Sequence, residues 1–271
     1  MASFAAAANA RPIPGAVATL GVSDRVTFLR KTYAHLGGAL VAFALFTAIL
    51  LRGMPDVSWG FSKWALQGRW TWLAVLLLFM VVGYVAERLA RSESSRGLQY
   101  VGLGVAVLAE AVLLQPMLWL VMLKFGDAGT QSILTGSFLH GGSVGGAVMS
   151  GTAGNIIMES VLITLVIFGG LTATVFISKK DFSFMGSFLT ICGFAALGVI
   201  VASMIFGFHL GAIFSGLMIL LMAGYILYQT SLVMKSFPPT GYVAASLMLF
   251  STIATLFWYV LRLMMELNSR R

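Results

Sequence analysis

Long apolar stretches separated by short polar ones dominate the chain, and they predict helices that cross a membrane. About 20 apolar residues of helix span a bilayer. Seven such stretches occur, at about residues 32–51, 70–86, 98–123, 155–177, 183–206, 210–231 and 242–267. The segments of about ten alternating residues that are typical of a transmembrane barrel are missing. The pattern therefore predicts an all-α polytopic membrane protein with seven transmembrane helices.

The last predicted helix carries a stripe of polar side chains. Its members recur at steps of three and four, and so share one helical face. They are Thr252, Thr255, Tyr259, Arg262 and Glu266. A polar face on a membrane-length helix is unfavourable against lipid. We therefore expect this face to meet protein or water, with the rest of the bundle arranged around the helix.

The regions outside the predicted helices are short. Residues 1–24 lack the continuous apolar core of a cleavable signal peptide and are expected to form a flexible tail, with residues 25–271 as the transmembrane domain. The connection at 207–209 is so short that the two helices it joins must be antiparallel neighbours. Residues 126–154 are rich in Gly, Ser and Thr and are expected to be irregular, ending at Asn155 as the N-cap of the next helix.

Composition and charge support the membrane class and exclude others. Hydrophobic residues make up 59% of the chain and charged residues 10%, and the mean hydropathy is +0.95, whereas soluble proteins have about 25% charged residues. The net charge of +8 does not indicate nucleic acid, because the Lys and Arg residues lie beside the helix ends. They are more numerous on the side of the N-terminus, which predicts a cytoplasmic N-terminus. The compact loops favour a bacterial inner membrane.

Few ionisable side chains fall inside the predicted helices. Glu110 lies near the middle of the third helix, where an unpaired carboxylate costs about 2.5–3.5 kcal/mol. It either lines an ion or proton path or is a neutral, hydrogen-bonded packing residue, and the sequence leaves both open. Glu159 is expected to be partly solvated near a helix N-terminus. Arg262 and Glu266 are four residues apart and are expected to pair as a structural anchor.

Signatures of an enzyme or a metal site are missing from the sequence. Three scattered histidines and one cysteine give no convincing zinc site. Ser150 with His140 or His209 would suggest an intramembrane hydrolase, but Ser150 lacks the G-x-S-x-G context of a nucleophile elbow. We therefore expect no catalysis, no metal site and no cofactor.

Several motifs resemble the Bax inhibitor-1 family, also called the transmembrane BAX inhibitor motif family. They are FLRKTY at 28–33, FGGLTA at 168–173, KKDFSF at 179–184, YILYQT at 225–230 and LFWYVLR at 256–262. The KKDFSF turn is the strongest of them. The resemblance implies seven helices with the last one central, wrapped by two layers of three.

The resemblance also implies a function. It implies a channel that lets cations, chiefly calcium, leak across the membrane and that is regulated by pH. Bacterial members, which this chain resembles most, are linked to a membrane-anchored ATP-dependent protease as substrate or modulator, and eukaryotic members suppress cell death. The expected function is therefore a calcium leak, with a non-conducting regulator of such a protease, or a stress-protective membrane protein, as the alternative. The expected partners are membrane lipids, calcium and the protease, and no nucleic acid.

The chain departs from the family pattern at one important place. In many members two aspartates, on the sixth and seventh helices, form a proton-sensitive latch; the matching positions here are Gln229 and Thr252. A carboxylate pair titrates, whereas an amide and a hydroxyl do not. The resemblance thus predicts that neither a pH latch nor strong calcium coordination exists at this place. The candidate pore or latch region comprises Glu110, Glu159, Gln229, Thr252, Thr255 and Arg262.

Overall fold

Seven membrane-length helices make up most of the molecule. The computed structural model describes residues 17–19, 21–92, 95–140, 143–144, 147, 151–178 and 180–269. Among these residues, seven helices are long and apolar enough to cross a membrane. They are α2 (Val22–Ala48, continued by a π-helical turn, Ile49–Gly53), α4 (Arg69–Ala90), α5 (Arg96–Phe125), α7 (Gly151–Ser178), α8 (Gly186–Phe206, preceded by a 3-10 turn, Ser183–Met185), α9 (Ala212–Lys235) and α10 (Tyr242–Asn268). The predicted fold class is confirmed.

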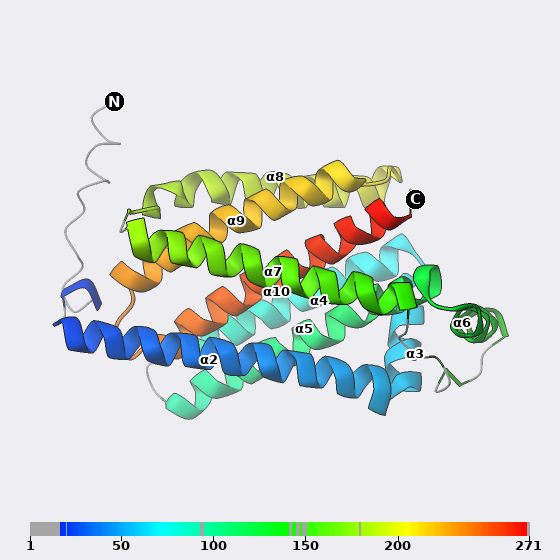
Figure 1. Ribbon diagram of the computed structural model, residues 1–271, viewed down its shortest axis with the longest axis horizontal. Helices are drawn as coiled ribbons and strands as arrows, with labels where there is room; N and C mark the ends of the chain where they lie inside the picture. Colours follow the sequence, from blue (N-terminus) through cyan, green and yellow to red (C-terminus); the bar gives the residue numbers. More distant parts are fainter. Residues whose placement is uncertain are drawn as a thin grey trace.

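Helix α10 lies at the centre of the bundle. Helices α2, α4 and α5 form one layer, α7, α8 and α9 form the other, and α10 passes between them (Figure 1). α10 packs against α2, α4, α5, α7 and α9. In its most apolar stretch 78% of the residues are buried, compared with 6% for α8. The central position explains why α10 can carry a polar face that lipid would not tolerate.

The short connection between α8 and α9 makes these helices antiparallel neighbours, as predicted. Gly207 ends α8 in the left-handed conformation, with φ of 77°, which glycine adopts without the cost of a side chain. At the other end of α8, a Cβ atom at Gly186 would lie 2.8 Å from the ring of Tyr228 on α9. A side chain at this position would push the two helices apart.

Two shorter helices cover the end of the bundle where α10 finishes (Figure 1). These are α3 (Pro55–Leu66) and α6 (Ala128–His140). The expectation of an irregular segment over residues 126–154 is wrong where α6 forms. Tertiary contacts hold α6: the indole N–H of Trp59 donates to Ser137 Oγ at 3.0 Å, and Lys63 Nζ donates to the Ser137 carbonyl at 3.2 Å.

Two further boundaries differ from the sequence-based expectation. Helix α7 begins at Gly151, so Asn155 lies inside the helix and is not its N-cap. Residues 1–16 of the predicted tail lie outside the described residues. Within the rest of that stretch, Val17 is buried and its N–H donates to the Phe237 carbonyl at 2.9 Å, and α2 already begins at Val22. The end of the expected tail therefore belongs to the packed bundle.

Candidate functional site

A cavity of about 810 Å³ lies beside the second half of α10. Helices α4, α5 and α8 and the α8–α9 turn complete its walls. Along α5 its lining runs from Lys124, which is exposed near the helix end, to Glu110 near the midpoint. At about 1.5 Å per residue, these two positions lie about 21 Å apart along the axis. The cavity therefore reaches the middle of a hydrocarbon core that is about 30 Å thick.

Most of the polar stripe on α10 faces this cavity. Thr255, Tyr259, Arg262 and Glu266 are among its lining residues, whereas Thr252 is not. The stripe therefore meets protein and an internal space, as the spacing of its residues predicts. Glu159, by contrast, is exposed on α7 and does not line the cavity.

Glu110 lies at the inner part of the cavity and makes no ion pair or hydrogen bond within the described part of the chain. Pro116, one to two turns later on α5, also lines the cavity. Proline has no N–H, and therefore leaves the carbonyl of residue 112 without its usual helical donor. The described residues therefore show no hydrogen bond for the alternative of a hydrogen-bonded packing residue, although the carbonyl of Val112 is a free acceptor within one turn of Glu110.

Arg262 and Glu266 hold the outer part of the cavity together. Arg262 Nε lies 3.3 Å from Glu266 Oε1, and both side chains are largely buried. A second guanidinium nitrogen of Arg262 donates to the Leu210 carbonyl in the α8–α9 turn. The pair therefore anchors α10 to that turn, which agrees with the structural role expected from its spacing.

Sequence reasoning missed the aromatic wall of the cavity. Trp72 of α4 stacks on Trp258 of α10, with ring centroids 5.9 Å apart and planes inclined by 20°, and both line the cavity. The grouping of Trp59, Trp64, Trp70 and Trp72 predicts an aromatic belt at the membrane surface. Trp64 and Trp70 are exposed, whereas Trp72 packs in the cavity wall and Trp59 is buried. Trp258 lies three residues after Thr255 and four before Arg262, and therefore on the same helical face. This spacing is the signal in the sequence that places Trp258 beside the polar stripe.

The cavity ends about half a helical turn from a buried hydrogen bond between α9 and α10. The hydroxyl of Thr252 donates to Gln229 Oε1 at 2.8 Å, and both residues are buried. Neither lines the cavity, whose lining on α10 begins at Ala254. The two residues at the matching latch positions thus meet each other directly, between α9 and α10.

Beyond this hydrogen bond, α10 is enclosed by apolar side chains. Leu249 and Phe250 are completely buried, and the ring of Phe250 packs edge-on against Phe43 of α2 at 5.7 Å. The first half of α10 is therefore part of a close-packed core, as is usual for buried apolar side chains.

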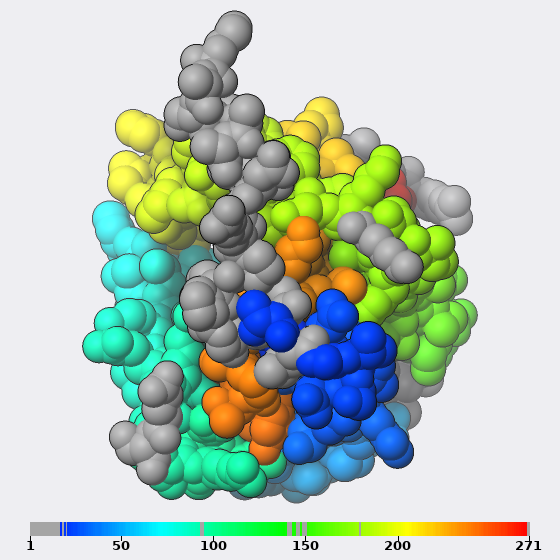
Figure 2. Space-filling model, turned by 90° about the vertical axis from the view of Figure 1, so that its left-hand side faces the viewer, coloured from blue at the N-terminus to red at the C-terminus, as the bar shows by residue number. Residues whose placement is uncertain are grey.

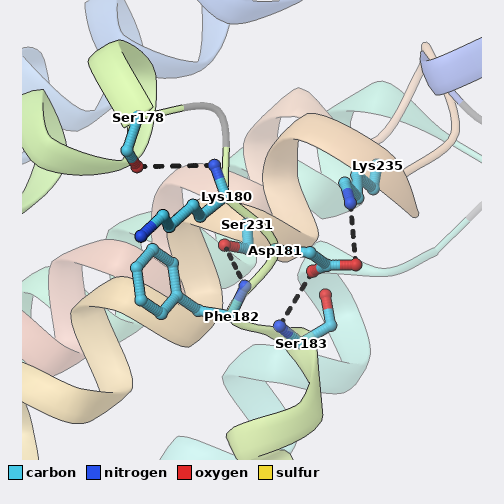
Figure 3. A network of polar contacts seen from close by, with 7 residues as sticks. All are labelled: Ser178, Lys180, Asp181, Phe182, Ser183, Ser231 and Lys235. Carbon is cyan, nitrogen blue, oxygen red and sulfur yellow. Dashed lines mark hydrogen bonds and ion pairs between the residues drawn. The ribbon is translucent and has the colours of Figure 1, made fainter. Parts of the chain in front are cut away.

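The turn between α7 and α8, which contains the KKDFSF motif, is tied to the end of α9 (Figure 3). Asp181 accepts from Lys235 Nζ at 2.7 Å and from the Ser183 N–H at 2.9 Å, and the Phe182 N–H donates to Ser231 Oγ at 3.2 Å. Partial burial alone would raise the pKa of Asp181, but the bonds from Lys235 and Ser183 lower it below its usual value. Ser231 is two residues from Gln229, so the turn anchors the segment of α9 that carries this glutamine.

Parts of the considered hydrolase site and of the KKDFSF motif lie outside the described residues. Ser150 and Lys179 lie outside the described residues, as does the side chain of His140. His209 lines the mouth of the cavity.

Comparisons with known proteins agree with this architecture. The family model described as "Inhibitor of apoptosis-promoting Bax1" matches residues 128–270, which is more than half of the chain. The chain is 27% identical to Bax inhibitor 1 of Schizosaccharomyces pombe over 253 residues, which cover 92% of this chain and 79% of the relative. No solved structure matches the chain.

Shorter matches extend to plants and bacteria. A BI1-like protein of Arabidopsis thaliana is 34% identical over 124 residues, which cover 42% of this chain and 47% of the relative. An uncharacterized membrane protein of Vibrio cholerae is 30% identical over 119 residues, which cover 42% of this chain and 51% of the relative. The fold, the central last helix and the family model lead to one assignment: the chain is an integral membrane protein of the Bax inhibitor-1 family.

Proposed function

We propose that this protein is a cation leak channel, chiefly for calcium, and that the cavity along α10 is its outer vestibule. The observation that carries the proposal is the position of Glu110, which lies on the cavity wall at mid-helix depth without a partner among the described residues. An intramembrane carboxylate that faces a cavity is typical of an ion pathway. With the N-terminus in the cytoplasm of a bacterial cell, the cavity opens to the outer side of the inner membrane.

Each part of the cavity has a role in this proposal. The negative charge of Glu110 attracts a cation into a region of low dielectric constant, where charges interact more strongly than in water. The hydrogen bond between Thr252 and Gln229 joins α9 to α10 just beyond the cavity lining on α10, and in this proposal conduction requires these two side chains to separate. Because neither side chain titrates near neutral pH, closure at this point does not respond to pH.

The test is calcium entry into liposomes that contain the purified protein and an internal calcium dye, measured at several pH values. We expect entry above that of empty liposomes at one or more of these pH values. Glu110→Gln removes the charge at the inner end of the cavity and should lower the rate severalfold. Glu159→Gln is the matched control, because Glu159 is exposed on α7.

Two results would contradict the proposal. Calcium entry equal to that of empty liposomes at every pH would exclude a calcium leak. Equal rates for Glu110→Gln and the unmodified protein would remove Glu110 from the pathway.

The inner end of the cavity favours a second candidate, a non-conducting regulator. The lining of the cavity stops at Ala254 on α10 and at Glu110 on α5, and the half of α10 before Ala254 is packed against neighbouring helices. Such a protein would act by binding a membrane partner, for which a membrane-anchored ATP-dependent protease is our proposal, in a stress-protective role. Crosslinking in native membranes tests this candidate, which fails if no membrane protein is recovered specifically.

A further inference from the structure

A second hollow lies on the outside of the bundle, between α2 and α5, and has no part in the proposed ion pathway. It is a groove of about 400 Å³, lined on α2 by His35, Gly38 and Phe46 and on α5 by Tyr100, Gly104 and Val107, among others. Its floor includes Ala39 and Leu103, which belong to the same buried cluster as the first half of α10. The groove therefore faces the surroundings of the bundle and not its centre.

The dimensions of the groove fit one leaflet of a membrane. From His35 to Phe46 the groove follows α2 for about 16 Å, at about 1.5 Å per residue. This is about half of a hydrocarbon core that is about 30 Å thick. A transmembrane helix of a partner would need a groove across the full thickness, whereas a lipid acyl chain occupies one leaflet only.

Polar and basic groups gather at the end of the groove near the start of α2. His35 Nε2 lies 3.0 Å from the Tyr100 hydroxyl, and Lys31 Nζ lies 5.5 Å from the ring centre of Tyr242 at the start of α10. Figure 2 shows this end of the molecule, where the blue surface of α2 lies beside the orange surface of the α9–α10 region. The three elements α2, α5 and α10 thus meet at the mouth of the groove.

Two exposed basic side chains among the described residues lie near this mouth. Lys31 lies one turn before His35 on α2, and Arg96 lies one turn before Tyr100 on α5; both are exposed. Neither forms an ion pair within the described part of the chain. Basic pockets between transmembrane helices on the cytoplasmic side are typical sites for anionic lipid headgroups, and each basic residue near the surface contributes about 1 kcal/mol, or about fivefold in affinity.

We infer that this groove binds an anionic phospholipid of the leaflet at the N-terminal side, with one acyl chain between α2 and α5 and the phosphate at Lys31 and Arg96. The aromatic rings of Tyr100 and Tyr242 lie at the level of the glycerol region, where amphipathic rings are favoured. Because the groove is separate from the cavity along α10, the inference is independent of whether the protein conducts ions.

Two adjacent glycines provide a matched pair of variants. Gly38 lines the groove and Gly37 does not, and a Cβ atom at either position meets no atom within 4 Å. Gly38→Leu should fill the groove and Gly37→Leu should not, while both variants should fold. Lys31→Gln removes a headgroup contact without touching the groove walls.

The experiment is native mass spectrometry of the full chain in detergent, titrated with dioleoyl phosphatidylglycerol or with dioleoyl phosphatidylcholine. We expect phosphatidylglycerol to bind the unmodified protein at least about fivefold more tightly than phosphatidylcholine, because the two differ in headgroup charge and not in acyl chains. Gly38→Leu should lower the binding of both lipids, Gly37→Leu should change neither, and Lys31→Gln should reduce the preference for phosphatidylglycerol.

Three results would overturn the inference. Equal binding of the two lipids would exclude recognition of an anionic headgroup. Equal behaviour of Gly37→Leu and Gly38→Leu, in variants that unfold at the same temperature as the unmodified protein, would exclude the groove as the site. A dimer that Gly38→Leu disrupts would show that the groove binds a second copy of the chain.

Discussion

The two halves of α10 belong to one continuous helix but have different surroundings. From Tyr242 to Ile253, apolar side chains of neighbouring helices enclose it, and its few polar groups bond to protein. From Ala254 to Ser269, one face of the helix borders the cavity and carries Thr255, Tyr259 and Arg262. The boundary falls at Thr252, whose hydroxyl bonds to Gln229. The central helix therefore acts as a packed core on one side of the membrane midplane and as a cavity wall on the other.

The largest expected effect comes from removing a ring in the enclosed half. Phe250→Ala removes a completely buried side chain that packs against Phe43, and should lower the free energy of unfolding by about 3–5 kcal/mol because it leaves a cavity. Thermal unfolding in detergent measures the change. Leu267→Ala is the control, because Leu267 is 45% exposed near the other end of α10. Equal losses in the two variants would contradict the contrast between the halves.

Access of water-soluble reagents should also differ between the halves. In a Cys192→Ala background, Thr255→Cys should react with a charged, membrane-impermeant maleimide at least about tenfold faster than Ser246→Cys, because the reagent needs access to the thiol. Thr255 lines the cavity and Ser246 is completely buried. The maleimide should label Thr255→Cys when it is added to the outside of intact cells. Labelling only from the cytoplasmic side would show that the proposed orientation is wrong.

The hydrogen bond between Thr252 and Gln229, at the boundary between the two halves, should contribute less to the free energy of unfolding than Phe250 does. Thr252→Val keeps the shape of the side chain but leaves Gln229 Oε1 without its donor, and should cost about 0.6–2 kcal/mol of stability, as is usual for hydrogen bonds between transmembrane helices. Thr255→Val is the comparison, because within the described part of the chain the Thr255 hydroxyl bonds to the Ser251 carbonyl of its own helix and to no other helix. If both variants unfold at the same temperature, the bond to Gln229 does not stabilise the boundary.

The smallest expected effect on stability comes from Asp181, in the α7–α8 turn near the end of α9. Bonds from Lys235 and Ser183 outweigh the effect of burial and lower the pKa of Asp181. The charged form is therefore favoured by folding. Its stabilisation should be present above the usual aspartate pKa of about 3.9 and should disappear as the pH falls through the lowered value. Asp181→Asn should cost about 0.2–1 kcal/mol at pH 7, as for an exposed ion pair.

The comparison with Lys235→Gln completes this last test. Unfolding of the single and double variants between pH 2 and pH 7 gives the interaction between the two residues. If the loss caused by Asp181→Asn stays constant down to the lowest pH, the carboxylate does not stabilise the turn through its charge.

Local sequence patterns predict the membrane helices well because the bilayer imposes them. A helix that crosses hydrocarbon must be long and apolar, so the seven stretches are visible without tertiary information. The same reasoning finds the polar stripe on α10, since lipid would not tolerate such a face. The spacing of Arg262 and Glu266 likewise predicts their pairing, because both residues lie on one helix.

Helices α3 and α6 are less predictable because tertiary contacts hold them. The helix at 128–140 depends on bonds from Trp59 and Lys63 to Ser137, which join residues far apart in the chain. The position of Trp72 in the cavity wall likewise depends on Trp258. Composition alone assigns such a tryptophan to the membrane surface.

The sequence by itself determined the class of the protein, the number of membrane-length helices and the polar face of the last one, because each follows from local hydrophobicity and helical spacing. Only the tertiary structure decided which part of that face borders a cavity and that Gln229 and Thr252 meet. It also decided that Glu110 has no partner among the residues the structure describes, while Glu159 is exposed. These features depend on how α4, α5, α8 and α9 pack around α10. Side chains brought together from distant parts of the chain leave no signal in the periodicity of any one helix.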